Sequence, residues 1–178
     1  MKTFEQAIAK ENFVITAEIS SPISCGPKEL EDKIDILKGT VHAINITDNP
    51  GATAHMSSLV GSAIVIEKGI DPILQITCRD RNRLAIQSDL MGASALGINN
   101  VLTLGGDPIK NGDQPDAKAV FDVNSKTLLT IMKNMNETGE TMSGRMLSTK
   151  GSFFPGSAAI VHDPTKEWDP KILNRKAE

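Results

Sequence analysis

The chain has 178 residues, of which 39% are hydrophobic, so it is long enough for one domain with a sizeable core and short for two. A net charge of −3 without any basic run, together with five Phe, one Trp and no Tyr, argues against nucleic acid as a partner. The polar amino terminus, the absence of a membrane-length apolar run and two distant cysteines, Cys25 and Cys78, predict a cytoplasmic protein with reduced thiols.

Apolar, β-branched runs alternate with segments of helical periodicity along the first two thirds of the chain. The expected strands are 13–19, 41–47, 72–78 and 100–104. The expected helices begin at Pro27 and end before Gly39, and span 57–68 and 82–96. This alternation predicts parallel strands that are joined by right-handed helical crossovers.

The regular alternation of strands and helices is less clear after residue 104. A polar loop over 110–118 precedes an expected helix over 122–135, and an irregular segment over 136–151 follows it. An expected strand over 153–161 contains Pro155 and Gly156, and a last helix is expected over 168–176. We therefore expect a single α/β domain of five β/α units over residues 1–178.

Two architectures fit five such units: an open doubly wound sheet, or a (β/α)8 TIM-type barrel that lacks its last three units. Whole barrels run to about 250 residues, so the second alternative implies that the C-terminal part is missing. The barrel is favoured because polar residues recur where successive strands end, namely Glu18, Thr47-Asp48, Gln75 with Thr77, and Asp107. Barrels assemble their active sites from those strand ends.

The stretch 99–110 carries the strongest local signal for a ligand site. A short apolar run over 101–104 is followed directly by Gly105-Gly106-Asp107-Pro108. Paired glycines let the backbone approach a ligand closely, and a carboxylate follows at once. An ordinary Gly-Gly-Asp-Pro turn fits the same four residues.

Several segments together resemble the methylenetetrahydrofolate reductase family, whose members are flavin-dependent β/α barrels of one-carbon metabolism. The resemblance covers nearly the whole chain, and its most telling parts are Thr-Cys-Arg-Asp-Arg-Asn (77–82) and Leu-Gly-Gly-Asp-Pro (104–108). Its other parts are Ala17-Glu18-Ile19 with Pro22, then 44–47, 84–96, 121–122, 153–159 and 173–176. The family pattern would continue beyond Lys176, so we expect a fragment, a truncated reading frame, or a subunit that another chain completes. The expected protein partner is this completing subunit or, in a homo-oligomer, further copies of the chain.

The resemblance implies FAD as cofactor and reduction of 5,10-methylenetetrahydrofolate to 5-methyltetrahydrofolate, with NADH, NADPH or a reduced iron–sulfur protein as the donor. It implies that Glu18 is the general acid and that Asp107 stabilises a folate cation; a structural ion pair and a plain turn are the alternatives. It implies cofactor contacts at Thr47, Asp48, Pro50, Gln75, Gly105, Gly106, Asp107, Phe121, Asp122, Ala159, Ile160, Asp169, Arg175 and Lys176.

A metal site is not expected, because His42, His55 and His162 share no ligand spacing with cysteines or carboxylates. Two hypotheses about function remain open from the sequence. The chain belongs to an FAD-dependent reductase, or it is an inactive or regulatory flavin- and folate-binding partial barrel that needs a partner chain.

Overall fold

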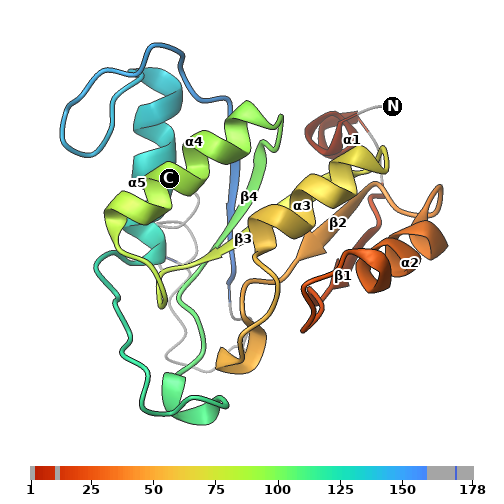
Figure 1. Ribbon diagram of the computed structural model, residues 1–178. Coiled ribbons are helices and arrows are strands. Elements are labelled where there is room, and N and C mark those ends of the chain that lie inside the picture. Colours follow the sequence, from red (N-terminus) through yellow and green to blue (C-terminus); the bar gives the residue numbers. More distant parts are fainter. Residues whose placement is uncertain (1–2, 11–12, 160–170, 172–178) are drawn as a thin grey trace.

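The computed structural model describes residues 3–10, 13–159 and 171, and these form one parallel sheet with helices packed against it (Figure 1). The strands are β1 Thr16–Ile19, β2 Ala43–Ile46, β3 Asp71–Thr77, β4 Asn100–Leu104 and β5 Phe154–Ser157. The helices are α1 Phe4–Lys10, α2 Lys28–Leu37, α3 Ser58–Glu67, α4 Arg83–Ala95 and α5 Ser125–Glu137, with short 3-10 turns η1 Pro50–Ala52 and η2 Ile109–Asn111. The expected alternation of strands and helices is confirmed over these residues.

The strands lie in the order β1-β2-β3-β4-β5, and each pairs in parallel with the next along the chain. A doubly wound sheet has a point at which the strand order reverses, and this sheet has none. Right-handed crossovers that all advance in one direction place their helices on one face of the sheet. The strand order therefore favours the barrel-type winding over the open doubly wound alternative.

Strand residues alternate between a helix-covered face and an opposite, more polar face. Ile44, Ile46 and Leu74 are fully buried and pack in two apolar clusters under the helices. The neighbouring residues Glu18 and Gln75 point to the other face, because successive strand side chains alternate. Burial of one face thus fixes which side chains remain for a site.

Helix α1 is an element that the sequence analysis missed. Thr3 and Gln6 cap each other, since each backbone N–H donates to the other's side chain at 3.3 Å. The N–H of Phe4 donates to Asp71 Oδ2 at 2.6 Å, and its ring meets Phe154 edge-on with the ring centroids 6.3 Å apart. The Thr-x-x-Gln capping box was the available signal, and tertiary contacts with the starts of β3 and β5 hold this short helix.

The ends of the sheet also differ from the expectation. Strand β1 begins at Thr16 instead of residue 13, and Phe13 is 76% exposed. Strand β5 ends at Ser157 instead of residue 161, and the expected helix over 168–176 lies outside the described residues except for Lys171. No helix in the described part of the chain is long and apolar enough to span a bilayer.

Candidate functional site

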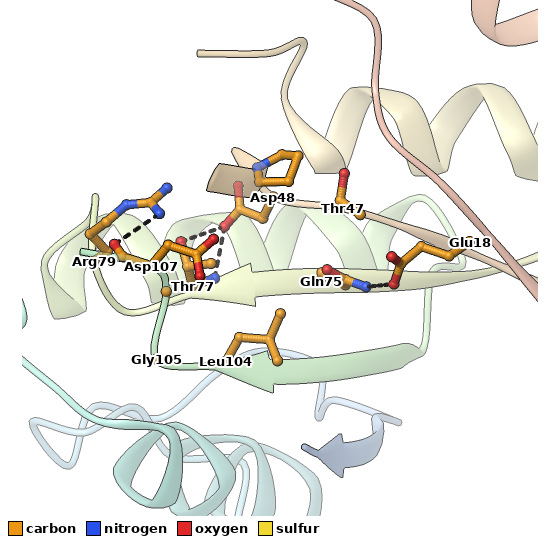
Figure 2. Close-up of a pocket in the computed structure, with 11 residues that line it drawn as sticks. Glu18, Thr47, Asp48, Gln75, Thr77, Arg79, Leu104, Gly105 and Asp107 are labelled. Carbon is orange, nitrogen blue, oxygen red and sulfur yellow. Dashed lines mark hydrogen bonds between the residues drawn. The ribbon is translucent and has the colours of Figure 1, made fainter. Parts of the chain in front are cut away.

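A pocket of about 390 Å³ lies where the strands β1 to β4 reach their carboxyl ends (Figure 2). It brings together eight of the predicted site residues: Glu18, Thr47, Asp48, Pro50, Gln75, Gly105, Gly106 and Asp107. Three further residues complete the lining: Thr77, which the sequence analysis names only as a polar strand-end residue, and Arg79 and Leu104, to which it gives no role. Residues far apart in the sequence meet here because parallel strands end at one edge of the sheet.

Glu18 and Gln75 form a direct pair within this pocket. Gln75 is buried, and its Nε2 donates a hydrogen bond of 2.8 Å to Oε2 of Glu18 (Figure 2). Glu18 itself is exposed. The reason is that, within the part of the chain that the structure describes, β1 is paired on one side only, with β2.

The two residues that follow β2 differ in how their side chains are used. The hydroxyl of Thr47 is buried and has no hydrogen-bond partner among the described residues, although Thr47 lines the pocket. Asp48 has a side chain that is 1% exposed, and its Oδ2 accepts from Thr77 N at 2.7 Å and Thr77 Oγ1 at 2.9 Å. The same oxygen is bonded by Nη2 of Arg81. Asp48 therefore joins the end of β2 to the end of β3.

Replacement of Asp48 by Ala is expected to lower the free energy of unfolding by about 3 kcal/mol, because it removes the carboxylate that the largely buried Arg81 guanidinium contacts most closely and leaves only the longer ion pair with Asp89, at 3.5 Å. Arg81 is affected most, since its Nε already has no hydrogen-bond partner in the described part of the chain. The measurement is urea unfolding of the wild-type protein and of the Asp48→Ala variant. Asp35→Ala is the control, because its exposed pair with Lys68 should contribute only about 0–1 kcal/mol. Equal losses in the two variants would contradict the structural role of Asp48.

The loop after β4 meets the loop after β2 above the end of β3. The N–H of Gly51 donates to Oδ2 of Asp107 at 2.9 Å, and Asp107 itself is exposed at the pocket. Arg79 lies beneath both loops, and its guanidinium donates to backbone carbonyls of each. Sequence reasoning quoted Arg79 only as part of a family motif, and a lone arginine after a strand carried no further signal.

Phe121 and Asp122 lie outside this first pocket and line a second one of about 280 Å³. Gly105 lines both pockets, and the second one also includes Cys78 and the start of α5. Asp122 accepts two hydrogen bonds of 2.7 Å from the Arg83 side chain and one of 2.9 Å from its backbone N–H. These bonds from Arg83 lower the pKa of Asp122 to about 2.

The Asp122 carboxylate predicts a pH dependence of stability. Its pKa falls from an ordinary 3.8 to about 2 on folding, so its contribution is present above about pH 4 and is lost as the pH falls toward 2. Asp122→Asn should therefore flatten the loss of stability in that window, as measured by urea unfolding at a series of pH values. Asp116→Asn, at an exposed carboxylate without a hydrogen bond in the described residues, should leave the slope unchanged. A slope equal to wild type in Asp122→Asn would refute the role of this pair.

The remaining predicted contacts lie at or beyond the end of the described chain. Ala159 is exposed and follows β5, so the expectation that it belongs to the fifth strand is wrong. Ile160, Asp169, Arg175 and Lys176 lie outside the described residues. Within residues 3–10, 13–159 and 171, no three His, Cys, Asp or Glu side chains gather as metal ligands would.

Comparison with known proteins adds two findings. A family model described as methylenetetrahydrofolate reductase matches residues 3–177. The chain is also similar to methylenetetrahydrofolate reductase 1 of Schizosaccharomyces pombe (strain 972 / ATCC 24843), with 26% identity over 132 residues. The aligned part is 72% of this chain, and the chain covers only 22% of the length of that relative.

Proposed function

Because the chain belongs to the methylenetetrahydrofolate reductase family, we propose that it reduces 5,10-methylenetetrahydrofolate to 5-methyltetrahydrofolate with FAD as its cofactor. The observation that carries the proposal is the pocket at the strand ends. Two exposed carboxylates, Glu18 and Asp107, line it together with two glycines and the Thr47 hydroxyl, which has no hydrogen-bond partner among the described residues. Family membership supports an oxidoreductase, and the substrate and cofactor are our inference.

The residues of the pocket fit a flavin. The buried Thr47 hydroxyl lacks a partner among the described residues and can hydrogen-bond a polar edge of the ring system. A Cβ on Gly105 would meet no atom within 4 Å, so open space lies beside this backbone and a flat ligand can approach it. Thr47, Gly105 and Gly106 would thus hold the cofactor. When bound, FAD supplies the two-electron chemistry that carries a hydride to the folate.

Glu18 would supply the proton that this reduction requires. The methylene carbon bridges two nitrogens of the folate, and opening of that ring needs a proton on the departing nitrogen. Gln75 holds Oε2 of Glu18, and Oε1 makes no hydrogen bond within the described residues. A carboxyl group fixed at one oxygen and free at the other can serve as a general acid toward a ligand in the pocket.

Asp107 would stabilise the cation that ring opening creates. The departure of one nitrogen leaves an iminium cation on the folate, next to which a fixed negative charge lowers the barrier. Gly51 N–H holds Oδ2 of Asp107, so its carboxylate is oriented before substrate arrives. Such preorganised charge is effective because it need not reorient during the reaction.

The test is a titration of the purified protein with FAD, followed by reaction of the reduced, anaerobic complex with 5,10-methylenetetrahydrofolate. We expect saturable flavin binding and formation of one equivalent of 5-methyltetrahydrofolate per reduced flavin. NADH, NADPH and a reduced iron–sulfur protein are compared as donors. Flavin binding without folate reduction would instead support the second hypothesis, an inactive or regulatory partial barrel. Failure to bind flavin would refute the proposal.

A further inference from the structure

Arg79 is a buried charge directly after β3, and it forms an ion pair with its neighbour Asp80. Its side chain is 1% exposed. Nε donates to Oδ1 of Asp80 at 2.7 Å, and Nη2 donates to Oδ2 at 2.8 Å. These hydrogen bonds raise the pKa of Arg79 and lower that of Asp80, so both groups are charged. This two-point pairing fixes the plane of the guanidinium.

The same guanidinium bonds the backbone of both loops that flank the pocket. Nη1 donates to the carbonyl oxygen of Asp107 at 3.3 Å (Figure 2), and Nη2 donates to the carbonyl oxygen of Asn49 at 3.0 Å. The loops are also joined directly, because Gly51 N–H donates to Oδ2 of Asp107 at 2.9 Å. Arg79 thus anchors the backbone on both sides of the hydrogen bond that orients the Asp107 carboxylate.

The Asn49 loop has a backbone that needs such an anchor. Asn49 has φ of +47°, a left-handed conformation that costs free energy in a residue other than glycine. Its side-chain Nδ2 donates to Oδ2 of Asp80 at 3.1 Å. The Arg79–Asp80 pair therefore bonds Asn49 twice, through its carbonyl oxygen and its side chain.

We propose that Arg79 is a positioning residue, which fixes the Asn49–Gly51 loop and thereby the direction of the Asp107 carboxylate in the pocket. The proposal rests on the function proposed above only for what the pocket binds. An arginine beside a flavin pocket invites the alternative that it binds the cofactor's phosphates. Here Nε, both hydrogens of Nη2 and one of Nη1 already point to protein oxygens, which favours the positioning role.

The test compares Arg79→Met and Arg79→Lys with Arg145→Met as the matched control. Arg145 is exposed, and its side chain makes no hydrogen bond or ion pair within the described residues. Two quantities are measured on each full-length variant: amide hydrogen exchange at Gly51 and the affinity for FAD. Val120 N–H, which donates to the backbone oxygen of Arg79 at 2.8 Å, reports whether the local fold survives.

In Arg79→Met we expect exchange at Gly51 to accelerate about tenfold or more and FAD to bind about tenfold more weakly, one hydrogen-bonded anchor being worth roughly that factor. Exchange at Val120 and at buried strand amides such as Leu74 should stay as in wild type. Arg79→Lys keeps the positive charge but lacks the planar guanidinium with its several N–H donors. Its Gly51 exchange rate and FAD affinity should therefore lie between those of Arg79→Met and wild type. Arg145→Met should match wild type in both measurements.

Three outcomes would overturn the proposal. Unchanged Gly51 exchange in a folded Arg79→Met variant, with or without weaker FAD binding, would mean that Arg79 does not hold the loop. Wild-type Gly51 exchange and wild-type FAD affinity in Arg79→Lys would mean that only the positive charge of Arg79 is needed, and not its hydrogen-bond geometry. If Arg79→Met fails to fold, wild-type exchange at Gly51 in folded Arg79→Lys would equally refute it. Wild-type protein that binds no FAD refutes the proposed function instead, while the exchange measurement still decides the role of Arg79.

Discussion

Glu18→Gln should lower the rate of folate reduction by about two to four orders of magnitude, the usual contribution of general acid catalysis. Glutamine keeps the shape of the side chain, and its carbonyl oxygen can still accept the hydrogen bond from Gln75 Nε2. It carries no proton that can be transferred to the departing folate nitrogen. The variant should therefore still bind flavin and accept electrons from the donor at the wild-type rate.

Stopped-flow absorbance measures the two half-reactions of Glu18→Gln separately. Glu67→Gln is the matched control, because Glu67 is an exposed residue of α3 whose side chain makes no hydrogen bond or ion pair in the described part of the chain. It should equal wild type in both steps. Folate reduction near the wild-type rate in Glu18→Gln would remove Glu18 from the mechanism. An equal loss in both half-reactions would point to a defect in flavin binding.

Gly106→Ala should lower the free energy of unfolding by about 4 kcal/mol and abolish tight flavin binding. Gly106 has φ of +98°, where an L-residue is strained. A Cβ there would lie 2.8 Å from Cβ of Arg79 and 3.3 Å from Cβ of Thr77, atoms that are fixed to the backbone at the end of β3. Relief of this clash must displace the loop that carries Asp107.

Urea unfolding and FAD titration measure these two effects, and the adjacent residue gives the control. A Cβ on Gly105 would meet nothing within 4 Å, so Gly105→Ala should change the free energy of unfolding by only about 0.5 kcal/mol or less. The large difference between two neighbouring glycines is the critical result. A Gly106→Ala variant as stable as Gly105→Ala would show that the loop relaxes without cost.

The residues at the strand ends illustrate how much of the site local pattern could predict. Glu18, Gln75 and Asp107 were selected because each follows or ends an apolar strand, and the structure places them in one pocket. Their roles in binding and catalysis stay predictions. Strands and helices were predictable because the burial of one face imposes a period on the sequence, and this period is visible without the fold.

Two features of the site depended on contacts between distant segments. Asp48 is predicted as a cofactor contact, which stays a prediction; the structure adds that its carboxylate is buried against Thr77 and Arg81. Arg79 carried no role until its bonds to Asn49 and Asp107 were seen. The residues of each loop can be read from a short stretch of sequence, whereas the partners of Asp48 and Arg79 on distant segments cannot. Some polar side chains form hydrogen bonds within the protein, and others remain available to a ligand. Only the pairing of buried charges in the folded structure distinguishes the two groups.

The sequence by itself determined the alternation of strands and helices and the edge of the sheet at which polar side chains collect. Only the tertiary structure decided that the strands follow one another without reversal and that α1 packs at the starts of β3 and β5. The physical reason is the range of the interactions. Hydrophobic periodicity acts over a few residues and is written in the chain, whereas strand neighbours and buried ion pairs are chosen by free energies that depend on the whole packed domain.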